Sequence, residues 1–155
     1  MSTSKLARLF AELLGTFALT AVIIAVSKNY GNPLFTTISA AAAVAGLYSI
    51  LGPVSGGHFN PAITLGLFSV KKVKFLEALM FVAMQAVGAV LAWKFFEYLS
   101  PERTIEAAGN EFTWEVLWAE LVGGLLFSLG FAAVVYRKFV GGQAGAVVGL
   151  SLFLA

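Results

Sequence analysis

The sequence predicts an all-α membrane protein, a bundle of spanning helices built as an inverted repeat with one short re-entrant helix. Three observations lead to this fold class. Of the 155 residues, 59% are hydrophobic and only 12% are charged, which is more apolar surface than one small soluble core can bury. The apolar residues gather in long stretches, which a glycine-rich segment ending in Asn-Pro interrupts. A short segment of the first stretch also recurs later in the chain.

Five apolar stretches are candidate spanning helices, because a bilayer core about 30 Å thick needs about 20 largely apolar residues. They cover 9–26, 34–51, 75–96, 114–135 and a last stretch that begins near Gln143 and is still apolar at Ala155. The first stretch is longer than the core of a usual signal peptide and contains Glu12, so we expect a retained helix. The last stretch predicts a chain truncated within its fifth transmembrane helix.

The segment between the second and third stretches predicts a half-helix. Gly52 and Pro53, followed by a Gly-Gly pair at 56–57, are expected to break the second helix, and Asn60 is expected to start a new one. The new helix can run only over 61–70 before three lysines follow. Such a helix is too short to cross a bilayer, so we expect it to be re-entrant.

The distribution of basic residues predicts a cytoplasmic N-terminus, because Lys and Arg in short loops stay preferentially on the cytoplasmic side. One side of the predicted topology receives Lys5, Arg8, Lys71, Lys72, Lys74, Arg137 and Lys138, and the other receives only Lys28, Lys94 and Arg103. The loop between the third and fourth spans is rich in glutamate and is therefore expected to be external: it carries Glu97, Glu102, Glu106 and Glu111.

An internal repeat predicts how the two parts of the chain are related. Residues 11–17 read Ala-Glu-Leu-Leu-Gly-Thr-Phe, and residues 119–125 read Ala-Glu-Leu-Val-Gly-Gly-Leu. With three spans in the first unit, a second copy enters the membrane in the opposite sense, as in many channels and transporters. We therefore expect one incomplete domain over 1–155, with 9–96 as the first repeat and 114–155 as the start of the second.

The segment 55–64, Ser-Gly-Gly-His-Phe-Asn-Pro-Ala-Ile-Thr, carries the functional prediction. Asn60 is a favoured N-cap and Pro61 suits the first helical position. The Asn60 amide would then offer two donors to a passing oxygen at the positive end of a helix dipole, and Ala62 is small enough for a second half-helix to approach. The preceding strand is expected to line a lumen with the carbonyls of Gly56, Gly57, His58 and Phe59.

Composition leaves little room for other functions. The chain has no cysteine and a single histidine, His58, so we expect neither a metal site nor a cofactor, and we do not expect an enzyme. The basic residues are spread between hydrophobic segments and form no arm or groove, so no nucleic-acid partner is expected. The expected partner is the lipid bilayer of a cell membrane.

At the Asn-Pro-Ala box, in the context Ser-Gly-Gly-His-x-Asn-Pro-Ala-x-Thr, the sequence resembles the aquaporin, or major intrinsic protein, family. The Glu-x-x-Gly starts of the first and fourth spans and the segment 85–89, Gln-Ala-Val-Gly-Ala, also match patterns of that family. The resemblance implies an aquaporin-like bundle and a passive channel for water or small uncharged solutes. It further implies a homotetramer with one pore per subunit, and a second half-pore that is missing from this chain.

The resemblance also implies roles for individual residues. Asn60 would be the donor at the pore centre, and the carbonyls of 56–59 would form a ladder of acceptors. Glu12 and Glu120 would brace the two pore loops through backbone N–H groups, with help from Gln85. A carboxylate within a span is costly unless it is paired or hydrogen-bonded, which agrees with such a role.

One position bears on the choice of solute. The family takes a filter residue twenty positions before the motif Asn, and this position is Ala40 here. Water channels of the family typically place Phe or His there, and glycerol channels an aromatic residue, so an alanine favours a wider filter. Three hypotheses remain open: a water channel, an aquaglyceroporin-like pore for glycerol or metalloid hydroxides, and a secondary transporter, since inverted repeats also build transporters.

Overall fold

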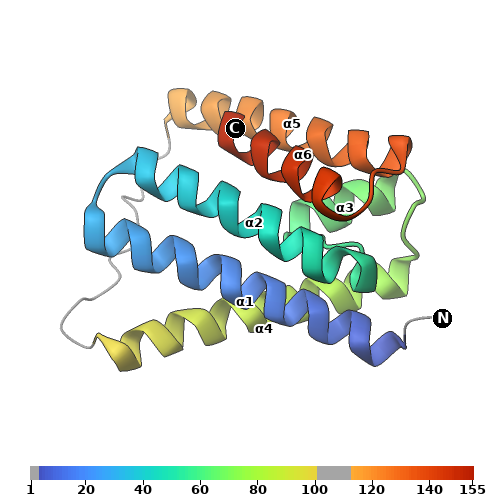
Figure 1. The fold of residues 1–155 in the computed structure, drawn as a ribbon, viewed down its shortest axis with the longest axis horizontal. Coiled ribbons are helices and arrows are strands. Elements are labelled where there is room, and N and C mark those ends of the chain that lie inside the picture. The colour runs from blue at the N-terminus through green and yellow to red at the C-terminus, as the bar shows by residue number, and fades with distance from the viewer. Residues whose placement is uncertain (1–3, 101–112) are drawn as a thin grey trace.

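The computed structural model describes residues 4–100 and 113–155, and these form six α-helices without a β-strand (Figure 1). The other residues include Arg103 and three glutamates of the predicted external loop, so those predictions lie outside the described residues. The helices are α1 (Lys5–Tyr30), α2 (Pro33–Ser55), α3 (Pro61–Ser69), α4 (Phe75–Leu99), α5 (Trp114–Arg137) and α6 (Gly141–Leu154).

Four of these helices, α1, α2, α4 and α5, are long and apolar enough to cross a membrane. The shortest of the four has 23 residues, which at about 1.5 Å per residue exceeds the thickness of the hydrocarbon core. Helix α6 is apolar but has 14 residues, and α3 has 9. The prediction of an all-α membrane fold is therefore confirmed.

Helix ends extend beyond the predicted apolar stretches, because capping rather than hydropathy fixes them. The hydroxyl of Ser4 accepts the N–H of Ala7 at 3.1 Å and starts α1. At the other end of α1, Gly31 adopts a left-handed φ of 60° and donates its N–H to Ser27. Helix α6 begins at Gly141, two residues before the predicted Gln143, without a side-chain cap bond.

The prediction that Gly52 and Pro53 break the second helix is wrong. Helix α2 continues through both residues to Ser55 and ends at Gly56, whose N–H donates to the Gly52 carbonyl at 2.8 Å. A proline in the last turn removes a single backbone donor, and membrane helices tolerate such a loss because neighbouring groups compensate for it. The Gly-Gly pair at 56–57 does end the helix.

The helices lie alongside one another, with α1 beside α4 and α2, and α6 beside α2 and α5 (Figure 1). Helices α1 and α4 run in the same direction, whereas α5 runs opposite to α1. Opposite directions of α1 and α5 are what an inverted repeat requires. The short α3 lies near one end of the bundle, where it contacts α4 and α5.

Small residues allow the closest helix approaches. A Cβ added at Gly88 of α4 would lie 2.5 Å from the Leu13 carbonyl oxygen of α1. One added at Gly149 of α6 would lie 2.6 Å from the Ala41 carbonyl oxygen of α2. Packing of this kind holds membrane helices together where no hydrophobic driving force acts. Gly46 of α2 takes no part in such packing, because it is exposed and a Cβ added there would meet no atom of another described element within 4 Å.

We predict that Gly88→Val separates α1 from α4 and destabilises the protein by about 1–3 kcal/mol or more, as overpacking does. Gly46→Val is the matched control, because it adds the same side chain to an exposed helical glycine with open space around it. The measurement is detergent unfolding followed by circular dichroism. Equal losses in both variants would mean that only helix propensity matters and would contradict the close approach.

Candidate functional site

The loop at 56–60 between α2 and α3 has a backbone that few sequences can adopt. Gly56 and Gly57 have φ values of 101° and 63°, which glycine tolerates because it lacks a Cβ. Phe59 also has a left-handed φ, 48°, which is rare for a bulky residue. Surrounding contacts must therefore hold Phe59 in place.

The Glu12 carboxylate of α1 holds this loop. Glu12 has no exposed surface, and its Oε1 accepts the Ser55 hydroxyl at 2.6 Å and the backbone N–H of His58 at 3.0 Å. Its Oε2 accepts the backbone N–H of Phe59 at 2.8 Å and the Gln85 amide at 2.7 Å. Both oxygens thus act only as acceptors, as those of an ionised carboxylate do. Four donors offset the cost of burying the charge.

A second set of bonds ties the loop to α3 and α4. The Gln85 amide also donates to the Thr64 hydroxyl at 3.0 Å, and this hydroxyl lies 3.1 Å from the Asn60 carbonyl. The His58 Nδ1 lies 3.0 Å from the same hydroxyl. Because a hydroxyl has one hydrogen, it donates either to the Asn60 carbonyl or to His58, and in the first case Nδ1 carries the proton.

Aromatic packing fixes the two side chains of the loop inside the protein. Phe59 is 2% exposed, and its ring lies against Gly15 of α1, where any side chain would collide with it. The His58 ring meets Phe81 and Phe131 edge-on, with ring centroids 5.2 and 6.1 Å away. The predicted pore-lining role of these residues therefore concerns their carbonyls and stays a prediction.

Asn60 caps α3 as expected from the motif. Its Oδ1 accepts the backbone N–H of Ala62 at 2.7 Å, and Pro61 occupies the first turn. Asn60 is half-buried, and its Nδ2 has no hydrogen-bond partner within the described part of the chain. Two donor hydrogens therefore remain available at the N-terminus of a helix, where the dipole is positive.

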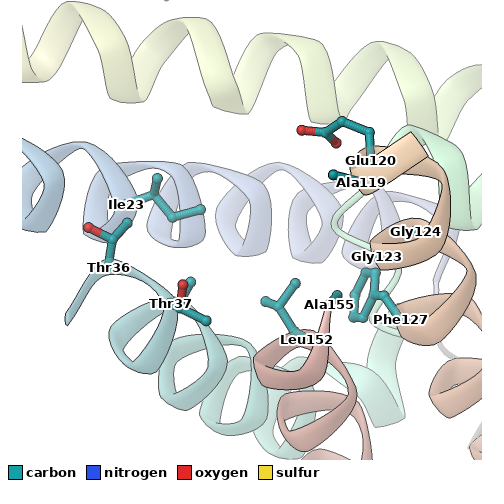
Figure 2. Close-up of a pocket in the computed structure, with 11 residues that line it drawn as sticks. Ile23, Thr36, Thr37, Ala119, Glu120, Gly123, Gly124, Phe127, Leu152 and Ala155 are labelled. Atoms are coloured by element: carbon teal, nitrogen blue, oxygen red, sulfur yellow. The ribbon is translucent and has the colours of Figure 1, made fainter. Parts of the chain in front are cut away.

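Ala40 and Glu120 line an open cleft of about 430 Å³ between α1, α2, α5 and α6. Figure 2 shows Glu120 on α5, well separated from Thr36 and Thr37, which are the other polar side chains drawn there. Glu120 is exposed and, within the described residues, has no hydrogen-bond partner, unlike its repeat counterpart Glu12. Its predicted loop-bracing role stays a prediction.

Sequence reasoning missed three participants of this site. Ser55 and Thr64 belong to the quoted motif, and their hydroxyls connect the loop to Glu12 and Gln85. The only signal that pointed to these two residues was their place in the motif that resembles the family pattern. Arg8 contacts the site from α1, where its guanidinium donates to the Ser55 carbonyl at 3.5 Å and pairs with Glu77. No local pattern connects residues so distant in sequence.

Comparisons with known proteins identify the family and relatives of this chain. The profile of the major intrinsic protein family matches residues 1–155. Rat aquaporin-5 is 36% identical over 105 residues, which are 65% of this chain and 38% of the relative. Human aquaporin-1 is 33% identical over 119 residues, which are 72% of this chain and 44% of the relative. Maize aquaporin TIP4-4 is 33% identical over 103 residues, 63% of this chain and 41% of the relative.

The matched region thus spans less than half the length of these curated relatives. Together with the four apolar helices, the similarity identifies a multi-pass integral membrane protein.

We predict that Glu12→Gln destabilises the chain by about 3 kcal/mol, although the two side chains have the same shape. Each Glu12 oxygen accepts one backbone N–H, which cannot reverse its direction, so the NH2 group of glutamine meets a fixed donor in either orientation. Glu120→Gln is the control and should change stability by less than about 0.5 kcal/mol, because Glu120 is exposed. Thermal unfolding in detergent measures both, and a Glu12→Gln variant as stable as the control would refute the anchoring role.

Proposed function

Since this chain belongs to the major intrinsic protein family, we propose that the complete protein is a passive transmembrane channel for water or other small uncharged solutes. The observation that carries the proposal is the free Nδ2 of Asn60 at the start of α3. Because the cap bond holds the Asn60 side chain, the two hydrogens of its NH2 group keep a fixed orientation. A solute oxygen that passes this point can exchange its water hydrogen bonds for bonds to the amide.

The position of Asn60 at the N-terminus of α3 also accounts for selectivity against cations. The N-terminus of α3 presents partial positive charge, which disfavours cations and protons in a narrow lumen. The carbonyls of 56–59 supply acceptors before this point, and Glu12 keeps that backbone in place. In this proposal Glu120 braces the equivalent loop of a second half-pore, and Gln85 supports the first. Each subunit of a homotetramer then holds one pore.

The orientation of the chain in the cell membrane is part of the proposal. The N-terminal ends of α1 and α4 lie at the same end of the bundle (Figure 1), and basic residues gather there. By the positive-inside rule this end is cytoplasmic, so the N-terminus is cytoplasmic.

An aquaglyceroporin-like pore is the second candidate, and one observation favours it. Ala40 contributes only a methyl group to the cleft that Thr36 and Thr37 also line. A small side chain at this level leaves room for a solute larger than water, such as glycerol or a metalloid hydroxide. The two threonine hydroxyls donate to the Asn32 and Pro33 carbonyls of their own helix, so their oxygens remain able to accept a hydrogen bond from such a solute.

A secondary transporter is less well supported. Coupling ions need ligands with free lone pairs near mid-membrane. Glu12, the buried carboxylate of the first repeat, already accepts four hydrogen bonds from the protein. Binding a cation there would require the loop to release its anchor.

We predict that the complete protein in proteoliposomes accelerates osmotic swelling, and that Asn60→Ala slows it severalfold. Asn32→Ala is the matched control, because Asn32 also precedes a proline and caps its helix with a bond to the Leu34 N–H at 2.9 Å. Each variant loses a cap worth about 1 kcal/mol, but only Asn60 offers its amide to the proposed lumen. Stopped-flow light scattering measures the rates.

If vesicles with correctly inserted protein swell no faster than vesicles of bare lipid, the channel proposal is wrong. Uptake that depends on a sodium or proton gradient would favour the transporter instead.

We predict that Ala40→Phe in the complete protein lowers glycerol permeability severalfold more than water permeability, because the added ring narrows the cleft. Ala42→Phe is the control, since Ala42 is exposed and lies in a groove between α2 and α6 outside this cleft. The ratio of glycerol-driven to water-driven swelling is the measurement. An unchanged ratio for Ala40→Phe would contradict the assignment of Ala40 to the filter.

A further inference from the structure

A separate pocket of about 370 Å³ lies between the first turns of α1 and α4, and no step of the proposed conduction uses it. Helix α1 contributes Lys5, Arg8 and Leu9 to its lining, and α4 with its cap contributes Lys74, Glu77 and Met80. We call it the headgroup pocket. Both helices begin at the same end of the bundle (Figure 1), so the pocket lies where two membrane helices reach the bilayer surface.

The charges of the headgroup pocket do not cancel. Glu77 is its single acidic residue and pairs with Arg8. Lys5 and Lys74 are exposed and make no ion pair within the described residues. Three basic residues against one acidic residue leave a net charge of +2. Helix N-termini add partial positive charge on both sides, and Lys74, the N-cap of α4, provides no side-chain bond to the first turn.

The walls of the pocket identify the kind of anion that fits it. Leu9 and Met80 present apolar surface beside the two lysines. A phospholipid carries a phosphate, which suits the lysines, next to a glycerol and acyl region, which suits the apolar walls. A free phosphate would gain nothing from these walls. Basic pockets between membrane helices on the cytoplasmic side bind acidic headgroups by this combination.

We propose that the headgroup pocket binds the phosphate of an anionic phospholipid, with Lys5 and Lys74 as its two cationic contacts. Arg8 stays with Glu77 and forms the floor of the site. Arg8 also donates to the Ser55 carbonyl at 3.5 Å, so the bound lipid lies next to the residue that supports the 56–60 loop. The proposal requires that the chain lies in a bilayer, but it does not depend on what the pore conducts.

The test is native mass spectrometry of the chain in mild detergent with equimolar dioleoylphosphatidylglycerol and dioleoylphosphatidylcholine. We expect severalfold more bound phosphatidylglycerol, and a loss of roughly tenfold in its affinity for the variant Lys5→Gln/Lys74→Gln, since each basic residue contributes. Lys5→Arg/Lys74→Arg should retain binding. Circular dichroism checks that all variants keep their helix content.

Lys71→Gln/Lys138→Gln is the matched control, because it removes two exposed charges outside the pocket lining. We expect less than a twofold change for it. An equal loss of lipid affinity in this control would mean that the overall surface charge, and not the pocket, attracts the lipid, and it would overturn the proposal. Equal binding of the two lipids would overturn it as well. Displacement of the lipid by millimolar inorganic phosphate would assign the pocket to free phosphate instead.

Discussion

The buried Glu12 carboxylate pairs the polar groups that a non-helical loop would otherwise leave unsatisfied inside a membrane protein. Backbone outside a helix is tolerated at membrane depth only where its N–H and C=O groups are paired or reach water. Glu12 accepts the N–H groups of His58 and Phe59, and its other two bonds come from Ser55 and Gln85. A buried charge costs several kcal/mol without partners, and here each oxygen has two. The left-handed Phe59 and the cap of α3 are positioned by this one side chain.

Close helix packing is what brings Glu12 and Gln85 together. Gly88 touches the backbone of Leu13, the residue after Glu12, and Gln85 lies three residues before Gly88 on α4. Residues three apart share a helix face, so the close approach at Gly88 places the Gln85 amide at the carboxylate. Helix packing and the polar network therefore depend on each other. Each hydrogen bond between membrane helices stabilises the protein only modestly. The helices are held in place by these bonds together with close packing at small residues.

Two carboxylates at equivalent places in the repeat have different surroundings. Glu12 is buried and fully bonded, whereas Glu120 is exposed and lines the cleft with Ala40. The neighbouring glycines differ as well, since Gly15 contacts the ring of Phe59 and Gly123 contacts the backbone of Ala155. Local sequence makes the same prediction for both glutamates. Their environments differ because the 56–60 loop packs on the first copy, and no described residue pairs with the second.

The sequence by itself determined the helices, the short α3 and its Asn60 cap, because hydropathy and capping act over a few neighbouring residues. It also pointed to Glu12 and Gln85, through the cost of burying a carboxylate and through the family resemblance. Only the tertiary structure decided that Pro53 stays inside α2 and that Arg8 reaches Ser55. It also fixed which four donors meet Glu12. The contacts of Arg8 and Glu12 join residues more than forty positions apart, and whether a membrane helix continues through a proline depends on its surroundings. Local sequence carries no information about either.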